Sequence, residues 1–129
     1  MPDTLVAAKT ALYDLLAVDA QGRPQPSLEK VRRVYRGEPA PGQAEKPICV
    51  TVASTSMGGD GITVTVRVYA ATDTQPLQAQ DDLDATVDAI ETLLEASTTF
   101  TQGTWTVVYV DALEALVASC PCRTPGTGF

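Results

Sequence analysis

The chain has 129 residues, of which 44% are hydrophobic and 19% are charged, and its formal net charge is −7. That length suits one domain with one core, and no apolar run approaches the roughly 20 residues of a membrane-spanning helix. The negative charge and the absence of histidine argue against a nucleic-acid-binding surface, which needs clustered lysine and arginine. The first residues lack the basic segment of a secretory signal, so we expect the protein to fold in the cytoplasm.

The N-terminal segment, residues 3–18, has apolar residues at helical spacing. Asp3 or Thr4 can cap its first turn by accepting a hydrogen bond from an unpaired backbone N–H group. Glycine and two prolines follow in residues 21–26, where they remove helical dihedral angles and hydrogen-bond donors. We therefore predict one amphipathic helix that ends before this loop.

Residues 31–36 contain two valines and a tyrosine, which favour a strand, and lie in the most basic part of the chain. Exposed charge discourages unwanted strand pairing, so the segment predicts a basic strand at the edge of a sheet. Residues 37–47 follow with three prolines and two glycines, a composition typical of a flexible surface loop. The arginines of the predicted strand are Arg32, Arg33 and Arg36.

Apolar and polar residues alternate in two segments, 48–53 and 62–69, and this period predicts an antiparallel hairpin with one apolar face. The apolar face should pack on a helix, whereas the polar face should stay available as a contact surface. We predict a flexible loop over residues 54–61, because its glycines suit the positive dihedral angles of hairpin loops. The expected exposed sheet face consists of Thr63, Thr65, Arg67 and Tyr69.

A long amphipathic helix is predicted to follow Pro76. Its large apolar residues recur at intervals of four, three and four, which places them in one stripe against the sheet. Acidic residues cover the other faces, and the early ones also favour the positive end of the helix dipole. The stripe is Leu83, Val87, Ile90 and Leu94, and the acidic face includes Asp84, Asp88 and Glu91.

The C-terminal part predicts a polar connection over residues 97–104 and a strand over residues 105–110. Residues 112–122 fit either a helical turn or a tight turn into a last strand, which Pro121 would confine to an edge because proline has no N–H group. We expect residues 123–129 to form a mobile tail. Together these elements predict one α+β domain over residues 1–129, with a small antiparallel or mixed sheet of about four to five strands and two main helices on one face.

The chain offers few groups for catalysis or metal binding. Because it has no histidine, a serine or cysteine nucleophile lacks its commonest base. The glycine-rich segment around Asp60 leads into a strand and lacks the Gly-Lys-Ser/Thr sequence of a phosphate loop, so a hairpin loop is favoured. Acidic residues 81–88 can share a magnesium ion, but charge opposite an apolar stripe ordinarily faces solvent. We therefore expect no enzymatic activity, no cofactor and no bound metal.

The three cysteines are Cys49, Cys120 and Cys122. Their odd number, and the single proline between the last two, argue against a disulfide framework. A structural zinc site needs a fuller set of ligands at short spacing. The favoured interpretation is that they are free thiols, buried as small hydrophobic residues or without a role.

The charges are distributed unevenly along the chain, with a basic segment at residues 30–36 and an acidic helix face at residues 81–95. Identical copies can dock head to tail through two such surfaces, and such contacts close into a ring when the rotation per step permits. Ordinary surface charge divided by chance explains the same layout equally well, because exposed ion pairs contribute little each.

The order of these elements resembles that of the small tail terminator proteins of long-tailed bacteriophages. The likeness spans nearly the whole chain and is carried by the strand ITVTVRVY at residues 62–69, the helix at residues 83–94, the strand WTVVY at residues 105–109 and the proline-containing end at residues 123–125. These are patterns of fold and include no catalytic signature.

The resemblance implies a non-enzymatic ring, a hexamer, that sits on the last ring of the tail tube in the virion. There it would stop tube polymerisation and present a surface to head-completion or neck proteins. Arg32, Arg33 and Arg36 would then face a neighbouring subunit or the tube, whereas the acidic helix would meet a basic partner or line a lumen. An acidic lumen would let DNA pass without specific binding, because like charges repel the phosphates.

Two other functions fit the same pattern of elements. A head-completion or minor tail protein of the neck is the nearest one, because such small α+β ring proteins are alike in sequence. A ligand-binding regulatory domain is of a different class, because helices on one side of an antiparallel sheet also form small-molecule modules. A ring component should self-associate through polar, charged surfaces, whereas a ligand module should enclose an apolar pocket.

Overall fold

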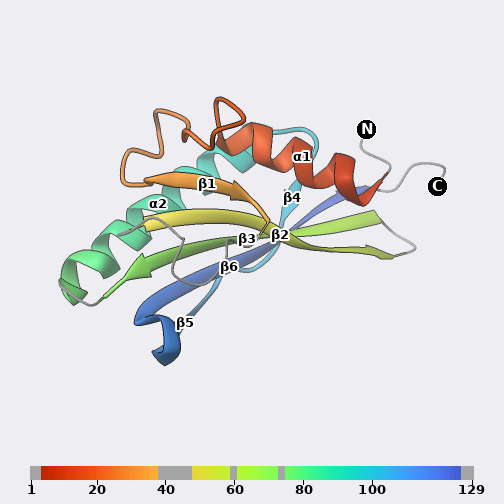
Figure 1. Ribbon diagram of the computed structural model, residues 1–129. Helices are drawn as coiled ribbons and strands as arrows, with labels where there is room; N and C mark the ends of the chain where they lie inside the picture. Colours follow the sequence, from red (N-terminus) through yellow and green to blue (C-terminus); the bar gives the residue numbers. More distant parts are fainter. Residues whose placement is uncertain (1–3, 38–47, 59–60, 73–74, 126–129) are drawn as a thin grey trace.

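A computed structural model of the chain describes residues 4–37, 48–58, 61–72 and 75–125. Within these ranges, one sheet of six strands carries two helices on one of its faces (Figure 1). The predicted fold class is confirmed. The elements in chain order are α1 (Leu5–Leu16), β1 (Arg33–Arg36), β2 (Ile48–Gly58), β3 (Gly61–Ala71), α2 (Pro76–Ala96), β4 (Thr101–Gln102), β5 (Thr106–Val110), the short 3₁₀ helix η1 (Asp111–Leu113) and β6 (Ala115–Pro125).

Both helices form where the apolar periodicity predicts them. α1 begins after Thr4, whose hydroxyl accepts a hydrogen bond from the N–H group of Ala7 at 3.1 Å and caps the first turn. α2 begins at Pro76, where the missing N–H group removes no helical hydrogen bond. The buried residues of α1 are Ala8, Leu12, Tyr13 and Leu16, and those of α2 are Ala79, Leu83, Thr86, Ile90 and Leu94.

The strands are arranged in the order β1-β2-β3-β6-β4. β5 also pairs with β6, on the same side as β4 but at a different part of the strand. β4 and β5 therefore share one edge of the sheet, and β1 forms the other edge, as predicted for the basic strand. β1 runs parallel to β2 and the remaining pairs are antiparallel. The sheet has more strands than the four to five expected, because part of the predicted connection before β5 pairs with β6 as β4.

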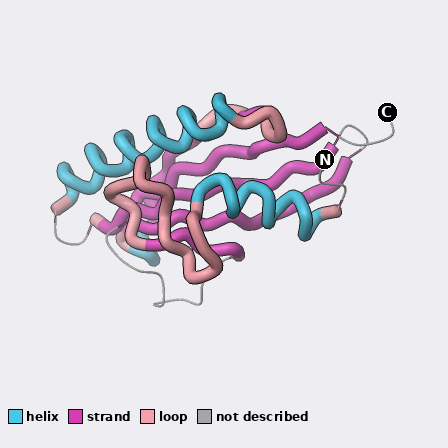
Figure 2. Tube along the Cα trace, turned by 90° about the horizontal axis from the view of Figure 1, so that it is seen from above, coloured by secondary structure: helices cyan, strands magenta, loops and turns pink. Residues whose placement is uncertain are grey.

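The core lies between the two helices and the valine-rich face of the sheet (Figure 2). α1 packs on β1, β2 and β3, and α2 packs on β3, β4 and β6, so that each helix covers one half of this face. The alternation predicted for the hairpin is thus confirmed. The strand residues of the core include Val34, Ile48, Val50, Val52, Ile62, Val64, Val66, Val68, Ala70, Ala118, Cys120 and Cys122.

The predicted loop over residues 54–61 is largely strand, so that prediction is wrong. Ser56 pairs with Thr63 and Gly58 with Gly61, and a register shift after Ala53 adds one residue to β2. Serine and glycine favour a loop locally, but β3 pairs on its other side with the end of β6, and this second ladder extends the hairpin. Residues 59–60, which include Asp60, lie outside the described residues.

The predicted mobile tail also begins too early. Residues 123–125 belong to β6, where Thr124 pairs with Ile62 and is fully buried. The same ladder that extends the hairpin holds this segment, which has no apolar periodicity of its own to predict it. Residues 126–129, and residues 38–47 of the predicted loop at 37–47, lie outside the described residues.

Residues 112–122 form η1 and then most of β6, and the expectation that Pro121 confines this strand to an edge is wrong. The carbonyl oxygen of Pro121 accepts a hydrogen bond from the N–H group of Gly103 at 2.7 Å. In an antiparallel strand the nitrogen and oxygen of one residue face the same neighbour. The proline nitrogen therefore faces residues 103–105, where the outer edge is interrupted between β4 and β5, and an N–H group is not needed there.

Candidate interaction surfaces

The charges of the sheet are of one sign. Within the strand bounds given above, every charged residue is an arginine, and the carboxylates of the described residues lie in the helices and loops. Arg33, Arg67 and Arg123 belong to rows on the face away from the helices. Arg36 pairs with the buried Val52 and so points to the helix side.

The face away from the helices, here called the open face, contains the four residues predicted for it. Thr63, Thr65, Arg67 and Tyr69 alternate with the buried valines of β3, and each is half-buried. Their pairing partners include three hydroxyl-bearing residues, Ser56 and the buried Thr51 on β2 and Ser119 on β6, and Ser119 shares a hydrogen bond with Thr106 at 3.2 Å. This face is thus rich in hydroxyl and guanidinium groups.

The outer edge of β1 is covered by the loop that follows α1. The N–H group of Val34 donates a hydrogen bond to the carbonyl oxygen of Gly22 at 2.8 Å. The loop thus takes the place that a neighbouring strand would have at this edge. Gly22 has φ +84°, and a Cβ atom there would lie 2.3 Å from the carbonyl oxygen of Val34. Only glycine combines this dihedral angle with so close an approach, so the cover over the edge depends on Gly22.

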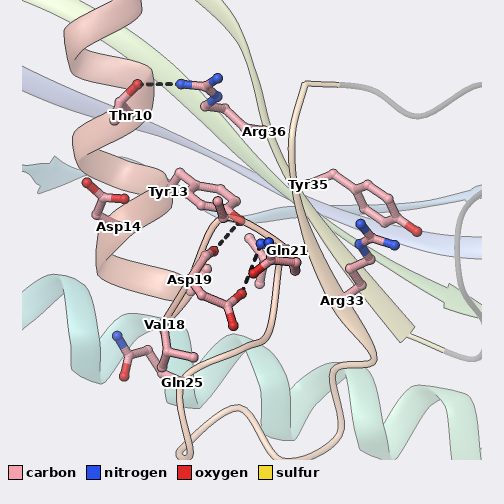
Figure 3. A pocket seen from close by; sticks show the side chains of 13 residues that line it. Thr10, Tyr13, Asp14, Val18, Asp19, Gln21, Gln25, Arg33, Tyr35 and Arg36 are labelled. Atoms are coloured by element: carbon pink, nitrogen blue, oxygen red, sulfur yellow. Dashed lines mark hydrogen bonds between the residues drawn. The ribbon is translucent and has the colours of Figure 1, made fainter.

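Asp19 holds the same loop in place (Figure 3). Its carboxylate accepts hydrogen bonds from the N–H groups of Gln21 at 3.0 Å and Arg23 at 3.2 Å, and pairs with the guanidinium of Arg23 at 2.6 Å. The backbone carbonyl oxygen of Asp19 accepts a hydrogen bond from the hydroxyl group of Tyr13 at 2.7 Å. Desolvation opposes ionisation, but these donors outweigh it and hold the pKa of Asp19 below its ordinary value.

The three arginines predicted as one patch are separated by the alternation of the strand. Arg36 donates to the hydroxyl of Thr10 on α1 at 2.9 Å. Arg33 lies over the ring of Tyr35, 5.4 Å from its centre, on the other side of β1 (Figure 3). Arg32 precedes β1 and is exposed. The expectation of a single basic surface is therefore corrected to two, because neighbouring strand residues point to opposite faces.

A cleft of about 860 Å³ lies between α1, the loop after it and β1 (Figure 3). Val18 and Ala20 contribute exposed apolar surface, whereas Ala17 and Val34 are buried in its wall. Carboxylate, amide, hydroxyl and guanidinium groups contribute the rest. This cleft was not predicted from the sequence, although the aspartate and glycine at positions 19 and 22 are turn-forming residues that could have indicated the loop. The lining residues are Thr10, Tyr13, Asp14, Ala17, Val18, Asp19, Ala20, Gln21, Gln25, Arg33, Val34, Tyr35 and Arg36.

The predicted acidic face of α2 is present. Asp84 and Asp88 are exposed and Glu91 is half-buried, on the sides of the helix that the apolar stripe leaves free. The basic segment reaches this helix, because Lys30 Nζ lies 3.9 Å from Asp82 Oδ1. The basic and acidic surfaces, expected to be separate, thus meet within a single copy where Lys30 approaches Asp82.

β5 is the most exposed strand of the sheet. Val107, Val108 and Tyr109 are 53%, 57% and 52% exposed. Val107 and Tyr109 pair with Ala118 and Leu116 on the helix side, whereas Val108 lies on the open face. This strand was predicted from the sequence but its exposure was not, because the exposure follows from its place at the sheet edge next to β6.

The cysteines are free and buried, as the favoured interpretation held. Contact with Cys120 and burial raise the pKa of the Cys122 thiol. Among the described residues, no three cysteine or carboxylate side chains lie close enough to hold a metal ion together. In the described part of the chain, neither helix combines the length and apolar character that crossing a bilayer requires.

No family model, curated protein or solved structure matches this chain.

Proposed function

We propose that this protein is a structural subunit of a phage virion that forms a ring, a hexamer, at the end of the tail tube. The ring stops polymerisation of the tube and presents a surface to the proteins of the neck. The single observation that carries the proposal is the separation of charge within one domain. The strands have arginine as their only charged residue, whereas α2 alone has six carboxylates.

This separation suits head-to-tail contact between copies. α2 covers the half of the sheet that ends in β4 and β5, whereas Arg32 and Arg36 lie at the opposite edge. The acidic helix of one copy can then face the basic edge of the next. Contacts between two different surfaces repeat from copy to copy and close when the rotation permits, and opposite charges favour one register over others.

The open face supplies a further surface that a ring subunit needs, because the tube or the neck must bind outside the contacts between subunits. Its hydroxyl and guanidinium groups suit the polar contacts of such a partner. The cleft beside β1 offers less support for a ligand-binding domain, because most of the residues that line it are polar and it is not an enclosed apolar pocket.

Native mass spectrometry over a range of concentrations tests the ring. We expect a closed oligomer for the natural protein and loss of that oligomer for Arg32→Glu and for Asp88→Lys, because each change places like charges together. The chain with both substitutions should regain the oligomer, since the two signs are exchanged. Lys9→Glu is the control, because it changes the net charge as Arg32→Glu does but lies on α1.

A second measurement distinguishes a tail terminator from other ring proteins of the neck. Added to growing tubes of the tail tube protein of the same virus, the protein should shorten the tubes and bind at their ends in electron micrographs. Tubes of unchanged length, or a monomer that retains a small molecule in the mass spectrum, would contradict the proposed function.

A further inference from the structure

We propose that β5 is the element by which one copy of this chain binds the next, and that it docks in the cleft beside β1. This inference rests on the proposed ring function and assigns the contact between its subunits. It comes from the contrast between an exposed edge strand, which no other described strand pairs on its outer side, and a cleft at the opposite edge of the same sheet.

β5 has the chemistry of a strand that another molecule covers. β6 pairs with one side of it, and alternate N–H and C=O groups face away from β6. The strand contains neither a charged residue nor proline, the two devices that ordinarily prevent pairing at an edge. Val107 and Tyr109 add apolar surface on the helix side. Its partner must therefore offer both apolar surface and groups that bond to a backbone.

The cleft offers both. Val18 and Ala20 line the cleft and are exposed, Val18 to 53%, so they can receive the side chains of Val107 and Tyr109. The carboxylates and amides around them, including Asp14, can bond to the outward N–H groups of β5. A volume of about 860 Å³ leaves room for several side chains.

Charge identifies the occupant of the cleft as a second copy of the chain. α2 packs on β6 and β4, next to β5, and therefore approaches with β5 when this strand docks. Its carboxylates then face Arg32 and Arg36 at the edge where the cleft lies. A neutral peptide from another source would fill the cleft but would leave this pairing of opposite charges unused.

Pairing of β5 with β5 of another copy is the competing arrangement. About a two-fold axis it would continue the sheet, but it would place two acidic α2 helices on the same face of the joint sheet, where they repel. It would also leave the cleft empty and the basic edge without a partner. The contact between β5 and the cleft satisfies both surfaces and repeats from copy to copy.

The test uses one variant on each side of the contact. Val107→Lys places a charge on β5, and Val18→Asp places one in the cleft. The controls are Val6→Lys and Val6→Asp on α1, because Val6 is 66% exposed and lines neither surface. Sedimentation velocity should show that each test variant raises the apparent dissociation constant more than about tenfold, whereas the controls assemble as the natural protein does. Circular dichroism verifies that all four variants fold.

Mixing the two test variants gives the sharper result. The intact β5 of the Val18→Asp chain should dock in the intact cleft of the Val107→Lys chain, and growth should stop there at a heterodimer. If Val18→Asp assembles normally while Val107→Lys does not, the cleft is not the docking site and the inference is wrong. If both variants form normal rings, the inference fails and the ring function stands. A natural protein that forms no ring and does not shorten tubes contradicts the function itself.

Discussion

The two edges of the sheet differ in how far they are covered by the rest of the chain. At β1, the N–H group of Val34 is bonded to Gly22 and the guanidinium of Arg36 is bonded to Thr10, so a loop and a helix cover the strand. At β5, the residues are uncharged and exposed. Open strand edges promote unwanted association, and proteins ordinarily protect them.

This difference indicates that the edge at β1 is covered within one copy, whereas the edge at β5 is available to a partner. Covering β1 requires a glycine with a positive φ and an aspartate that binds two backbone N–H groups, so the cover of this edge depends on specific residues. A chain that protects one edge so specifically and leaves the other apolar has a surface that is suited to be covered on assembly. Four substitutions test this contrast.

Gly22→Ala should have the largest effect. The new Cβ would lie 2.3 Å from a backbone oxygen at φ +84°, so we expect the free energy of unfolding to fall by about 3–4 kcal/mol. Gly37→Ala is the matched control, because φ is +109° there and no described atom lies within 4 Å of the added Cβ. It should cost only about 1–2 kcal/mol. Equal losses in urea unfolding would show that Val34 and Gly22 are not closely packed.

Gly103→Ala should weaken the opposite edge by less. Its Cβ would lie 2.8 Å from Cγ and 3.0 Å from the carbonyl oxygen of Pro121, and a change of ring pucker relieves only the first contact, so we expect a loss of about 1–2 kcal/mol in unfolding free energy. A second substitution, Pro121→Ala, removes this Cγ atom and should restore part of the loss in a double-mutant cycle. Strictly additive losses would contradict the contact.

Thr10→Val removes the acceptor that joins β1 to α1. Both partners are solvent-accessible, so the cost should be below about 1 kcal/mol by urea unfolding. In a chain that already has Arg36→Ala, the same substitution should cause no further loss, because the hydrogen bond is absent. A full second loss would show that Thr10 stabilises the helix in another way.

The smallest effect is the pH dependence of the loop that covers β1. The folded pKa of Asp19 is lowered, so its contribution is present above the unfolded pKa of about 3.9 and is lost as pH falls through the folded pKa. Asp19→Asn should therefore lower the thermal midpoint at pH 7 but have less effect toward pH 3. A difference that is constant over this range would contradict the role of the ionised carboxylate.

Several elements follow from the sequence alone. The apolar stripes of α1 and α2 and the alternating valines of β3 match the helical and strand periods, and each pattern is complete within a short segment. The acidic face of α2 follows as well, because residues opposite a buried stripe are exposed. The basic edge strand could be predicted because charge at residues 32–36 is compatible only with partial exposure.

The tertiary structure alone decided the rest. Serine, glycine and threonine at the end of β2 and at residues 123–125 favour loops locally, and only the ladders of β3 with β2 and β6 make them strands. The central place of Pro121, the separation of Arg33 from Arg36 and the cleft each depend on neighbours far away in the chain. The physical reason is that hydrogen bonds between strands join distant segments, whereas periodicity records only which side of a segment is buried.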